Sequence, residues 1–463
     1  MKKFDYSTYL SPFTWRYGSE QMRQIWSEEN KRKLWRKVWV ALAKAQKDLG
    51  LVSKKELDDL IKYKDQIDIK RAQKIEENVY HDLMAEVKTY AEQAKIGGGK
   101  IHLGATSTDI EDNVDALRIK ESLEIIERKI KELLKIFAQK ITKYKDLLCM
   151  GYTHLQPAEP TTLGYRLAFY GQDLILDYQL LQFVKSQIKG KGMKGAVGTS
   201  ASYIELVGDE GAEEIEKAVM KELGLLAVTI ANQTVTRKIE SLVGSLLSSL
   251  AQTLYKFAFD VRIMQSPGFS EWQEYTGSKD IGSSAMPFKK NPQRSEQICS
   301  LARLVMQLAK ILEENAANML LERTLDDSAN RRVVLPEIFL ATEQIVDVGT
   351  KVLQGLIVNK ENIKANLEKF ASFAATEAIL MEASKKGADR QKLYQSLREI
   401  CMSAWNQMTE GKENPMERML LENKDLKKYL KEDEIKKLLN VKSHIGNALE
   451  KALTLVREIK KIS

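Results

Sequence analysis

Long apolar runs are absent from this chain of 463 residues. No stretch approaches the roughly 20 uncharged apolar residues that a membrane span requires, so we expect no transmembrane segment. The N-terminus, MKKFDYSTYLSPFTW, begins with two lysines but no apolar core follows them, so we expect no signal peptide. With 43% hydrophobic and 29% charged residues, the composition is that of a soluble globular protein, and the length predicts two or three domains.

Cysteine is scarce, and its placement excludes two kinds of site. Cys149, Cys299 and Cys401 are odd in number, lie far apart and form no paired motif. This pattern argues against disulfides and against a zinc site, and it favours a reducing, cytoplasmic compartment. The sequence also has no Walker loop, no Rossmann glycine fingerprint and no His-Glu-x-x-His motif, so we expect neither a nucleotide cofactor nor a metal.

Proline and strand-forming patterns are also rare. Only eight prolines occur, and none lies between Pro12 and Pro157, so no proline breaks a helix in that stretch. Apolar residues recur every three or four positions in three segments. These are 239–264, 301–312, and a segment that Asp109 could cap and that runs towards Leu147. Helices of this length are uncommon in compact domains, so the sequence predicts an all-α fold built on a long-helix bundle.

The formal net charge is +8, from 72 basic and 64 acidic residues, and the pI is about 8.9. A positive balance suits an anionic ligand, and nucleic acid is the alternative. In KDLKKYLKEDEIKK (424–437), however, the lysines are interleaved with acids, which is typical of a solvated helix face. Nucleic-acid binding would predict a basic stripe with interleaved aromatic residues, and we see none. We therefore expect a small anionic ligand and no nucleic-acid partner.

Histidine is rare too, and three of the four histidines lie in short polar segments between helices. His81 stands in VYHDLMAE, His102 in GGGKIHLGATSTDIEDN and His154 in GYTHLQPAEPTT. A single histidine is more often a structural residue than a catalyst, and that alternative stays open for the first two. His154 differs, because hydroxyl residues surround it and two prolines just after it fix the backbone. We therefore predict a catalytic role for His154.

One segment, GSSAMPFKKNPQRSE from Gly282 to Glu296, interrupts the helical pattern. Its small residues let backbone N–H groups face a ligand, and such a nest attracts negative charge. Lys289 and Lys290 add two cations, and Pro292 suits the first turn of the helix that follows. The segment therefore predicts an anion-binding loop near a helix N-terminus, with an ordinary surface loop as the alternative.

Two further segments carry arginines. LERTLDDSANRR (321–332) places three arginines around two aspartates and a serine, and TWRYGSEQM near the N-terminus contains Arg16 and Tyr17. Guanidinium groups match phosphate and carboxylate geometry, although a salt-bridged helix turn would have the same composition. Hydroxyls, histidines, a lysine and arginines together suit proton transfer on a polyanionic substrate.

The segment GSSAMPFKKNP resembles the signature of the fumarase/aspartase superfamily of lyases, roughly Gly-Ser-Ser-x-Met-Pro-x-Lys-x-Asn-Pro. Its continuation through Arg294, Ser295 and Glu296 is similar to the adenylosuccinate lyase family within it. HLGATS, THLQPAEPTT and, above all, ERTLDDSANRR are similar to that family as well. The resemblance runs from about Arg16 to ATEAILM (375–381), and the residues after it match weakly.

The resemblance implies β-elimination of fumarate from a succinyl-amine. Members of the family act on two substrates of purine biosynthesis: adenylosuccinate, giving AMP, and the succinylated aminoimidazole ribotide SAICAR, giving AICAR. A base removes a proton beside a carboxylate, an aci-carboxylate carbanion forms, and an acid protonates the departing nitrogen. The implied enzyme is a carbon–nitrogen lyase that needs no cofactor.

The resemblance also implies roles for five residues. Ser283 is the base on a mobile loop, and Lys289 with the backbone N–H groups would favour its alkoxide. His154 is the general acid, a role that suits an imidazole. Glu296 resembles the glutamate that orients this histidine, and His81 resembles the histidine near the substrate phosphate.

Further residues stand at the positions with which the family binds substrate. They are Arg16, Tyr17, Tyr80, Asp82, Thr106, Ser107, Gln233, Asn291, Arg323, Ser328 and Arg332. Three positions depart from the pattern: Tyr80 stands where some members carry arginine, Gln297 where some carry a further arginine, and Phe288 replaces a tyrosine or histidine. None of these departures removes the acid or the base, so we expect an active enzyme.

The fold that the resemblance implies is all-α, in three domains with a central long-helix bundle. We place the domains at residues 1–106, 107–358 and 359–463, because the chain breaks near 97–108 and near 355–362. In this superfamily the bundle assembles into a homotetramer, and each active site takes segments from three subunits. We therefore expect a homotetramer whose polar segments meet between subunits.

Several alternatives stay open. Within the superfamily they are argininosuccinate lyase, aspartase and fumarase, and ERTLDDSANRR and the lack of their variants of the serine loop count against them. A catalytically silent helical scaffold is the alternative from a different class. Such a protein would be expected to have lost Ser283, Lys289 or His154, and all three are present.

Overall fold

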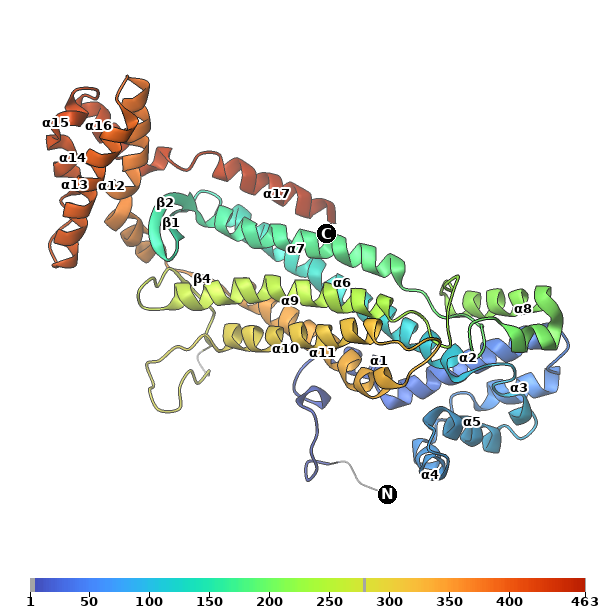
Figure 1. Ribbon diagram of the computed structural model, residues 1–463. Helices are drawn as coiled ribbons and strands as arrows, with labels where there is room; N and C mark the ends of the chain where they lie inside the picture. Colours follow the sequence, from blue (N-terminus) through green and yellow to red (C-terminus); the bar gives the residue numbers. More distant parts are fainter. Residues whose placement is uncertain (1–4, 278–279, 463) are drawn as a thin grey trace. The chain divides into compact units, whose positions relative to one another are not determined.

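A computed structural model describes residues 5–277 and 280–462, and these residues form an all-α protein, as the sequence predicts (Figure 1). The chain divides into two compact units. The first consists of Met1–Ile130, Asp177–Leu254 and Ser300–Asp347, and the second of Lys131–Leu176, Tyr255–Cys299 and Val348–Ser463. The division into three domains at residues 106 and 358 stays a prediction.

Five long helices contribute residues to both units. They are α6 (Ser107–Lys143), α7 (Leu163–Gln187), α9 (Lys238–Gln265), α10 (Gln293–Ala317) and α11 (Asp326–Gln354). The helices predicted at 239–264 and 301–312 are confirmed as α9 and α10. The third begins two residues before the predicted position, because Asp109 acts from inside the first turn: its carboxylate accepts from the backbone N–H of Thr106 at 3.1 Å.

The first unit adds shorter helices to parts of these five. They are η1 (Pro12–Thr14), α1 (Glu20–Ile25), α2 (Glu28–Asp48), α3 (Lys54–Tyr63), α4 (Ile69–Val79), α5 (Asp82–Gln93), η2 (Gly98–Lys100) and α8 (Ala201–Leu223). Its core is apolar, and Trp26 stacks on Phe339 of α11 with ring centroids 5.5 Å apart. Helices α9 and α10 pack closely at Gly244, where a Cβ atom would lie 3.1 Å from Leu312.

The second unit contains a β-hairpin that the sequence did not predict. Strands β1 (Leu148–Thr153) and β2 (Gln156–Thr162) pair antiparallel, and a bulge lies between Met150 and Tyr152. A second short ladder joins β3 (Trp272–Gln273) to β4 (Ile357–Val358). The aromatic rings of Phe137, Tyr170 and Phe257 contact one another in the core of this unit.

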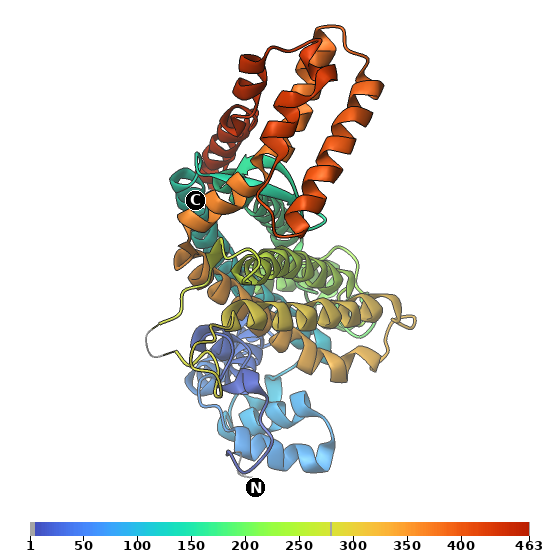
Figure 2. The ribbon, with the colours of Figure 1, turned by 90° about the vertical axis from the view of Figure 1, so that its left-hand side faces the viewer.

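The C-terminal helices of the second unit form a small bundle, drawn in orange and red in Figure 2. The bundle consists of α12 (Lys360–Lys385), α13 (Arg390–Thr409), α14 (Met416–Glu422), α15 (Lys424–Lys427) and α16 (Glu432–Leu438). After it come η3 (Val441–Ser443) and α17 (Ala448–Ile462), and α17 contacts β2. One apolar core joins α12 to α16. Helix α12 also packs on both strands of the hairpin. None of the described helices combines the length and the apolar character that a membrane crossing demands.

Candidate active site

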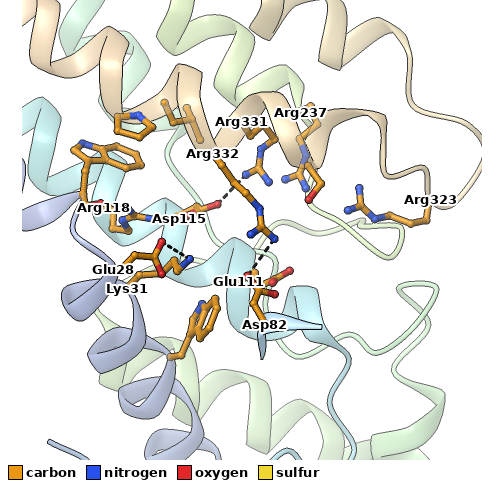
Figure 3. A pocket seen from close by; sticks show the side chains of 15 residues that line it. Glu28, Lys31, Asp82, Glu111, Asp115, Arg118, Arg237, Arg323, Arg331 and Arg332 are labelled. Carbon is orange, nitrogen blue, oxygen red and sulfur yellow. Dashed lines mark hydrogen bonds and ion pairs between the residues drawn. The ribbon is translucent and has the colours of Figure 1, made fainter. Parts of the chain in front are cut away.

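A cavity of about 110 Å³ lies in the first unit, where the start of α11 faces α2, α5 and α6 (Figure 3). Four predicted substrate-binding residues line it: Asp82, Arg323, Ser328 and Arg332. The lining also carries further charged side chains: Glu28, Lys31, Glu111, Asp115, Arg118, Arg237 and Arg331. The lining therefore contains six cationic and four acidic side chains, and what a ligand meets depends on which of the cations are already paired.

The two adjacent arginines of α11 have different roles. Arg331 forks onto Glu240 with N···O distances of 2.6 and 2.9 Å and reaches Asp115 at 2.9 Å. Arg332 extends across the cavity to Asp82 at 3.1 Å, and its side chain is 55% exposed (Figure 3). Arg331 is therefore committed to buried carboxylates, whereas Arg332 is accessible to a ligand.

A second ionic group closes the inner wall of the cavity. Arg237 donates to Asp327 at 2.7 Å and to Asp112 at 2.9 Å, and Arg323 donates to Asp327 at 2.8 Å. Among the described residues, the buried Nη2 of Arg237 has no hydrogen-bond partner. The pairs with Asp327 fix Arg237 and Arg323 against the first turn of α11.

Glu111, on the cavity wall, has a pKa far above the ordinary value of a carboxyl group. Burial, and after it the nearby carboxylates of Asp82, Asp112 and Asp115, together raise the pKa of its carboxyl from 4.5 to about 8. The side chain is therefore mostly protonated at neutral pH, which makes the wall more positive. Neither the motifs nor the spacing of charges in the sequence singled out Glu111, because the effect arises from carboxylates that meet only in the fold.

Glu111→Gln is expected to stabilise the protein at neutral and alkaline pH. The folded protein retains a proton that the unfolded chain releases, so stability falls as the pH rises from the ordinary pKa of 4.5 towards 8. Glutamine has no such loss, and we expect a gain in the free energy of unfolding of roughly 2 kcal/mol at pH 7. Urea unfolding between pH 4 and pH 8.5 measures it, and an equal gain at both ends would contradict this explanation.

His81 and Asp82 begin α5, which a buried ion pair holds against α2. Glu86 accepts from Arg32 at 2.8 Å and from Arg36 at 2.7 Å, and none of these side chains is appreciably exposed. His81 makes no side-chain capping bond, and its Nε2 lies 3.3 Å from the hydroxyl of Ser107. The structure therefore brings together two of the predicted site residues at the starts of α5 and α6.

Thr106, Gln233 and Tyr80 are the next predicted substrate-binding residues of the first unit. Thr106 precedes α6, and Thr108 on its first turn donates to the backbone carbonyl of Gln233. Tyr80 is 90% exposed and has a φ of 53°, in the left-handed region. His102 has the features of a structural residue and not of a catalyst. Burial lowers its pKa to about 4, and its Nδ1 accepts from Trp39 at 3.1 Å.

Arg16 and Tyr17 lie in the segment after η1 and do not line the cavity. The Arg16 guanidinium lies 5.8 Å from the ring centroids of both Trp15 and Tyr17. The backbone carbonyl of Tyr17 accepts from Arg23 at 3.1 Å, which fixes this segment to the start of α1. Their predicted contact with substrate stays a prediction.

In the second unit, His154 lies at the tip of the hairpin. Thr153 pairs with Gln156, so His154 and Leu155 form a two-residue turn. Both have positive φ, at 54° and 60°, and both side chains are exposed. The turn presents the imidazole to solvent at the end of two paired strands.

The segment from Gly282 to Pro292, called the serine loop here, supplies backbone donors to Ser283. Its hydroxyl accepts from the backbone N–H of Met286 at 3.1 Å and of Ala285 at 3.4 Å, so the donors come from just after the predicted Gly-Ser-Ser nest. Asn291 donates to the carbonyl of Gly282 at 2.7 Å and closes the loop. A Cβ atom at residue 282 would lie 2.3 Å from the carbonyl oxygen of Lys289, so the closure requires glycine.

The end of this loop is held by Glu274, a residue that no sequence motif indicated. Glu274 is 1% exposed, and its carboxylate accepts from the N–H groups of Arg294 and Ser295 at 3.0 and 2.9 Å and from the Ser295 hydroxyl at 2.8 Å. It thereby satisfies free N–H groups at the start of α10. Glu296 lies in that first turn with its side chain exposed.

Within the described part of the second unit, no hydrogen bond or ion pair joins the side chains of His154, Ser283, Lys289 and Glu296. The side chains of Lys289 and Glu296 are exposed. No group of three or more histidine, cysteine, aspartate or glutamate side chains that could hold a metal occurs among the residues described. The catalytic assignments therefore stay predictions.

Comparison with known proteins identifies the family to which the chain belongs. Residues 14–307 match the lyase family, and residues 372–451 match the family described as adenylosuccinate lyase C-terminus. An adenylosuccinate lyase from Methanocaldococcus jannaschii is 36% identical over 97% of this chain and 96% of its own length. The chain belongs to the adenylosuccinate lyase family.

Other members of the adenylosuccinate lyase family are similarly close. The protein from Pyrococcus abyssi is 37% identical over 95% of this chain and 96% of its own, and that from Saccharomyces cerevisiae 35% over 98% and 95%. Two solved structures share the fold at lower identity. A 3-carboxy-cis,cis-muconate lactonizing enzyme from Pseudomonas putida is 22% identical with a TM-score of 0.86, covering 97% of this chain and 99% of its own. A fumarate lyase from Mesorhizobium sp. BNC1 is 23% identical with a TM-score of 0.84, at the same coverage.

Proposed function

We propose that this protein eliminates fumarate from adenylosuccinate, giving AMP, and from SAICAR, giving AICAR. The observation that carries the proposal is the similarity to adenylosuccinate lyases over almost the whole chain. The presence of Ser283, Lys289 and His154 supports an active enzyme over a silent scaffold. The exposed guanidinium of Arg332 on the cavity wall supports an anionic substrate.

In this proposal, Ser283 is the base. Its alkoxide removes the proton from the carbon beside a substrate carboxylate, and the electron pair moves into that carboxylate as a doubly charged aci-form. A serine hydroxyl is a weak base, so its alkoxide needs stabilisation. The N–H groups of Ala285 and Met286, at 3.4 and 3.1 Å from Oγ, and the ammonium of Lys289 would supply it.

His154 is the proposed acid. The carbon–nitrogen bond breaks as the aci-form collapses to fumarate, and the imidazolium gives its proton to the departing nitrogen. Glu296 would orient this ring. His81 would contact the substrate phosphate, and the substrate would bind the remaining predicted residues: Arg16, Tyr17, Tyr80, Asp82, Thr106, Ser107, Gln233, Asn291, Arg323, Ser328 and Arg332.

We further propose a cytoplasmic homotetramer with active sites shared between subunits. Helix α7 supports it, because large apolar side chains recur along it at helical spacing and stay exposed in the single chain. Tyr165 is 40% exposed, Phe169 53%, Leu176 59% and Phe183 52%. Exposed apolar faces of this kind usually mark protein interfaces.

A proton NMR time course with adenylosuccinate tests the reaction. We expect the vinylic signal of fumarate to appear with adenylosuccinate and SAICAR and to stay absent from a parallel tube with argininosuccinate. Fumarate from argininosuccinate alone would keep the mechanism and change the substrate. Fumarate from none of the three would favour the silent scaffold.

A further inference from the structure

The turn that carries His154 is strained. His154 and Leu155 occupy the two central positions of a two-residue hairpin turn, and both have φ values in the left-handed region. Such turns favour glycine, which has no Cβ, and asparagine or aspartate, whose short polar side chains hydrogen-bond locally, whereas histidine and leucine are disfavoured there. A strained turn persists only when the surrounding structure holds it. The contacts that hold this hairpin therefore bear on the placement of the imidazole.

One buried carboxylate fastens the hairpin to the rest of the unit. Glu271 is 0% exposed, and its Oε1 accepts from the hydroxyl of Tyr152 at 3.0 Å and from Asn366 of α12 at 3.2 Å. Its other oxygen, Oε2, pairs with Arg166 of α7 at 3.4 Å. Tyr152 stands two residues before His154 on β1. The carboxylate thus joins β1, α7 and α12 at one point.

Further contacts fix the same strand. Arg166 donates to the backbone carbonyl of Met150 at 2.5 Å. The ring of Tyr152 packs edge-to-face on Phe269, with centroids 4.9 Å apart. Burial and the charge of Glu271 raise the pKa of the Tyr152 hydroxyl, so it stays a proton donor to the carboxylate at any working pH. Every polar partner of Glu271 in this group is therefore a donor.

We propose that Glu271, Tyr152 and Arg166 are positioning residues for His154, holding β1 so that the strained turn presents the imidazole to the departing nitrogen. The inference rests on the proposed role of His154 as the general acid. Protonation of the leaving group is realised only in the transition state. A misplaced imidazole should therefore lower kcat and leave KM almost unchanged.

The test uses Tyr152→Phe, because Glu271→Ala would leave the Arg166 cation buried without a partner and would threaten folding. Phenylalanine keeps the ring on Phe269 and loses one hydrogen bond. We expect kcat with adenylosuccinate to fall about tenfold, a part of the 10²–10⁴ that a general acid contributes, with KM within about twofold of the parent. Thermal unfolding of both proteins shows that the variant is folded.

Tyr170→Phe is the matched control. Tyr170 also donates to a carboxylate, that of the partly buried Asp260, at 2.6 Å. It lies in the same unit but hydrogen-bonds to neither Glu271 nor Tyr152 among the described residues. It should keep the parent kcat. A kcat of Tyr152→Phe within about twofold of the parent, a loss that Tyr170→Phe shares, or a loss confined to KM would overturn the proposal. His154→Ala, measured alongside, separates the proposed acid from the proposed positioning residues. If His154→Ala were fully active, His154 would not be the acid. If His154→Ala lost activity and Tyr152→Phe did not, only the positioning role would be contradicted.

Discussion

Ser283→Ala is expected to lower kcat by about 10³-fold or more while substrate still binds. The substitution removes the atom that would accept the proton, and with it the acceptor for the N–H groups of Ala285 and Met286. The loop closes through Asn291 and the carbonyl of Gly282 at 2.7 Å, a contact that does not involve the serine hydroxyl. Fumarate release measures turnover, and equilibrium dialysis with labelled adenylosuccinate measures binding.

Ser284→Ala is the matched control for this loss. Ser284 is the next residue along the chain, its side chain is exposed, and its hydroxyl has no part in the proposed reaction. It should retain most of the parent turnover. If Ser283→Ala turned over like the parent, Ser283 would not be the base. If both variants lost turnover equally, the loop conformation and not the hydroxyl would explain the effect.

The long helices could be predicted because their burial repeats along the sequence. Apolar residues spaced by three and four positions define α9, and the structure ends this helix at Gln265, one residue after the last of them. The β1–β2 hairpin could not be predicted in this way. Its strands contain glycine and two prolines, which are poor strand formers, and it is held from outside by α12.

Some residues of the candidate site could be predicted from the sequence, and others could not. Short motifs indicated Ser283, His154 and the arginines of α11, because their residue types suit the chemistry. The sequence could not separate Arg331 from Arg332, since adjacent helical residues point in different directions and only the fold decides which meets Asp115 and Glu240. Glu271 and Glu274 were missed because isolated carboxylates in SEWQE carry no signal of burial.

His154→Ala and Ser283→Ala are each expected to be nearly inactive alone and to regain activity when mixed. If an active site takes its acid and its base from different subunits, mixed tetramers contain some sites with His154 from one variant and Ser283 from the other. Random exchange at equal amounts would restore about a quarter of the sites. The measurement is fumarate release before and after subunits are exchanged, with exchange confirmed by mass spectrometry of differently tagged chains.

A second mixture, of the double variant with the parent, gives a test that does not depend on the residual activity of the single variants. The double variant His154→Ala, Ser283→Ala mixed with the parent contains half of the functional acids and half of the functional bases. Shared sites would fall from half to about a quarter of the parent activity on exchange, because acid and base must then coincide by chance. Sites built within one subunit would stay at half. Regained activity in the first mixture and a fall to a quarter in the second together require that His154 and Ser283 of one chain serve different active sites. If exchange were confirmed and neither mixture changed in activity, both residues of one chain would serve the same active site.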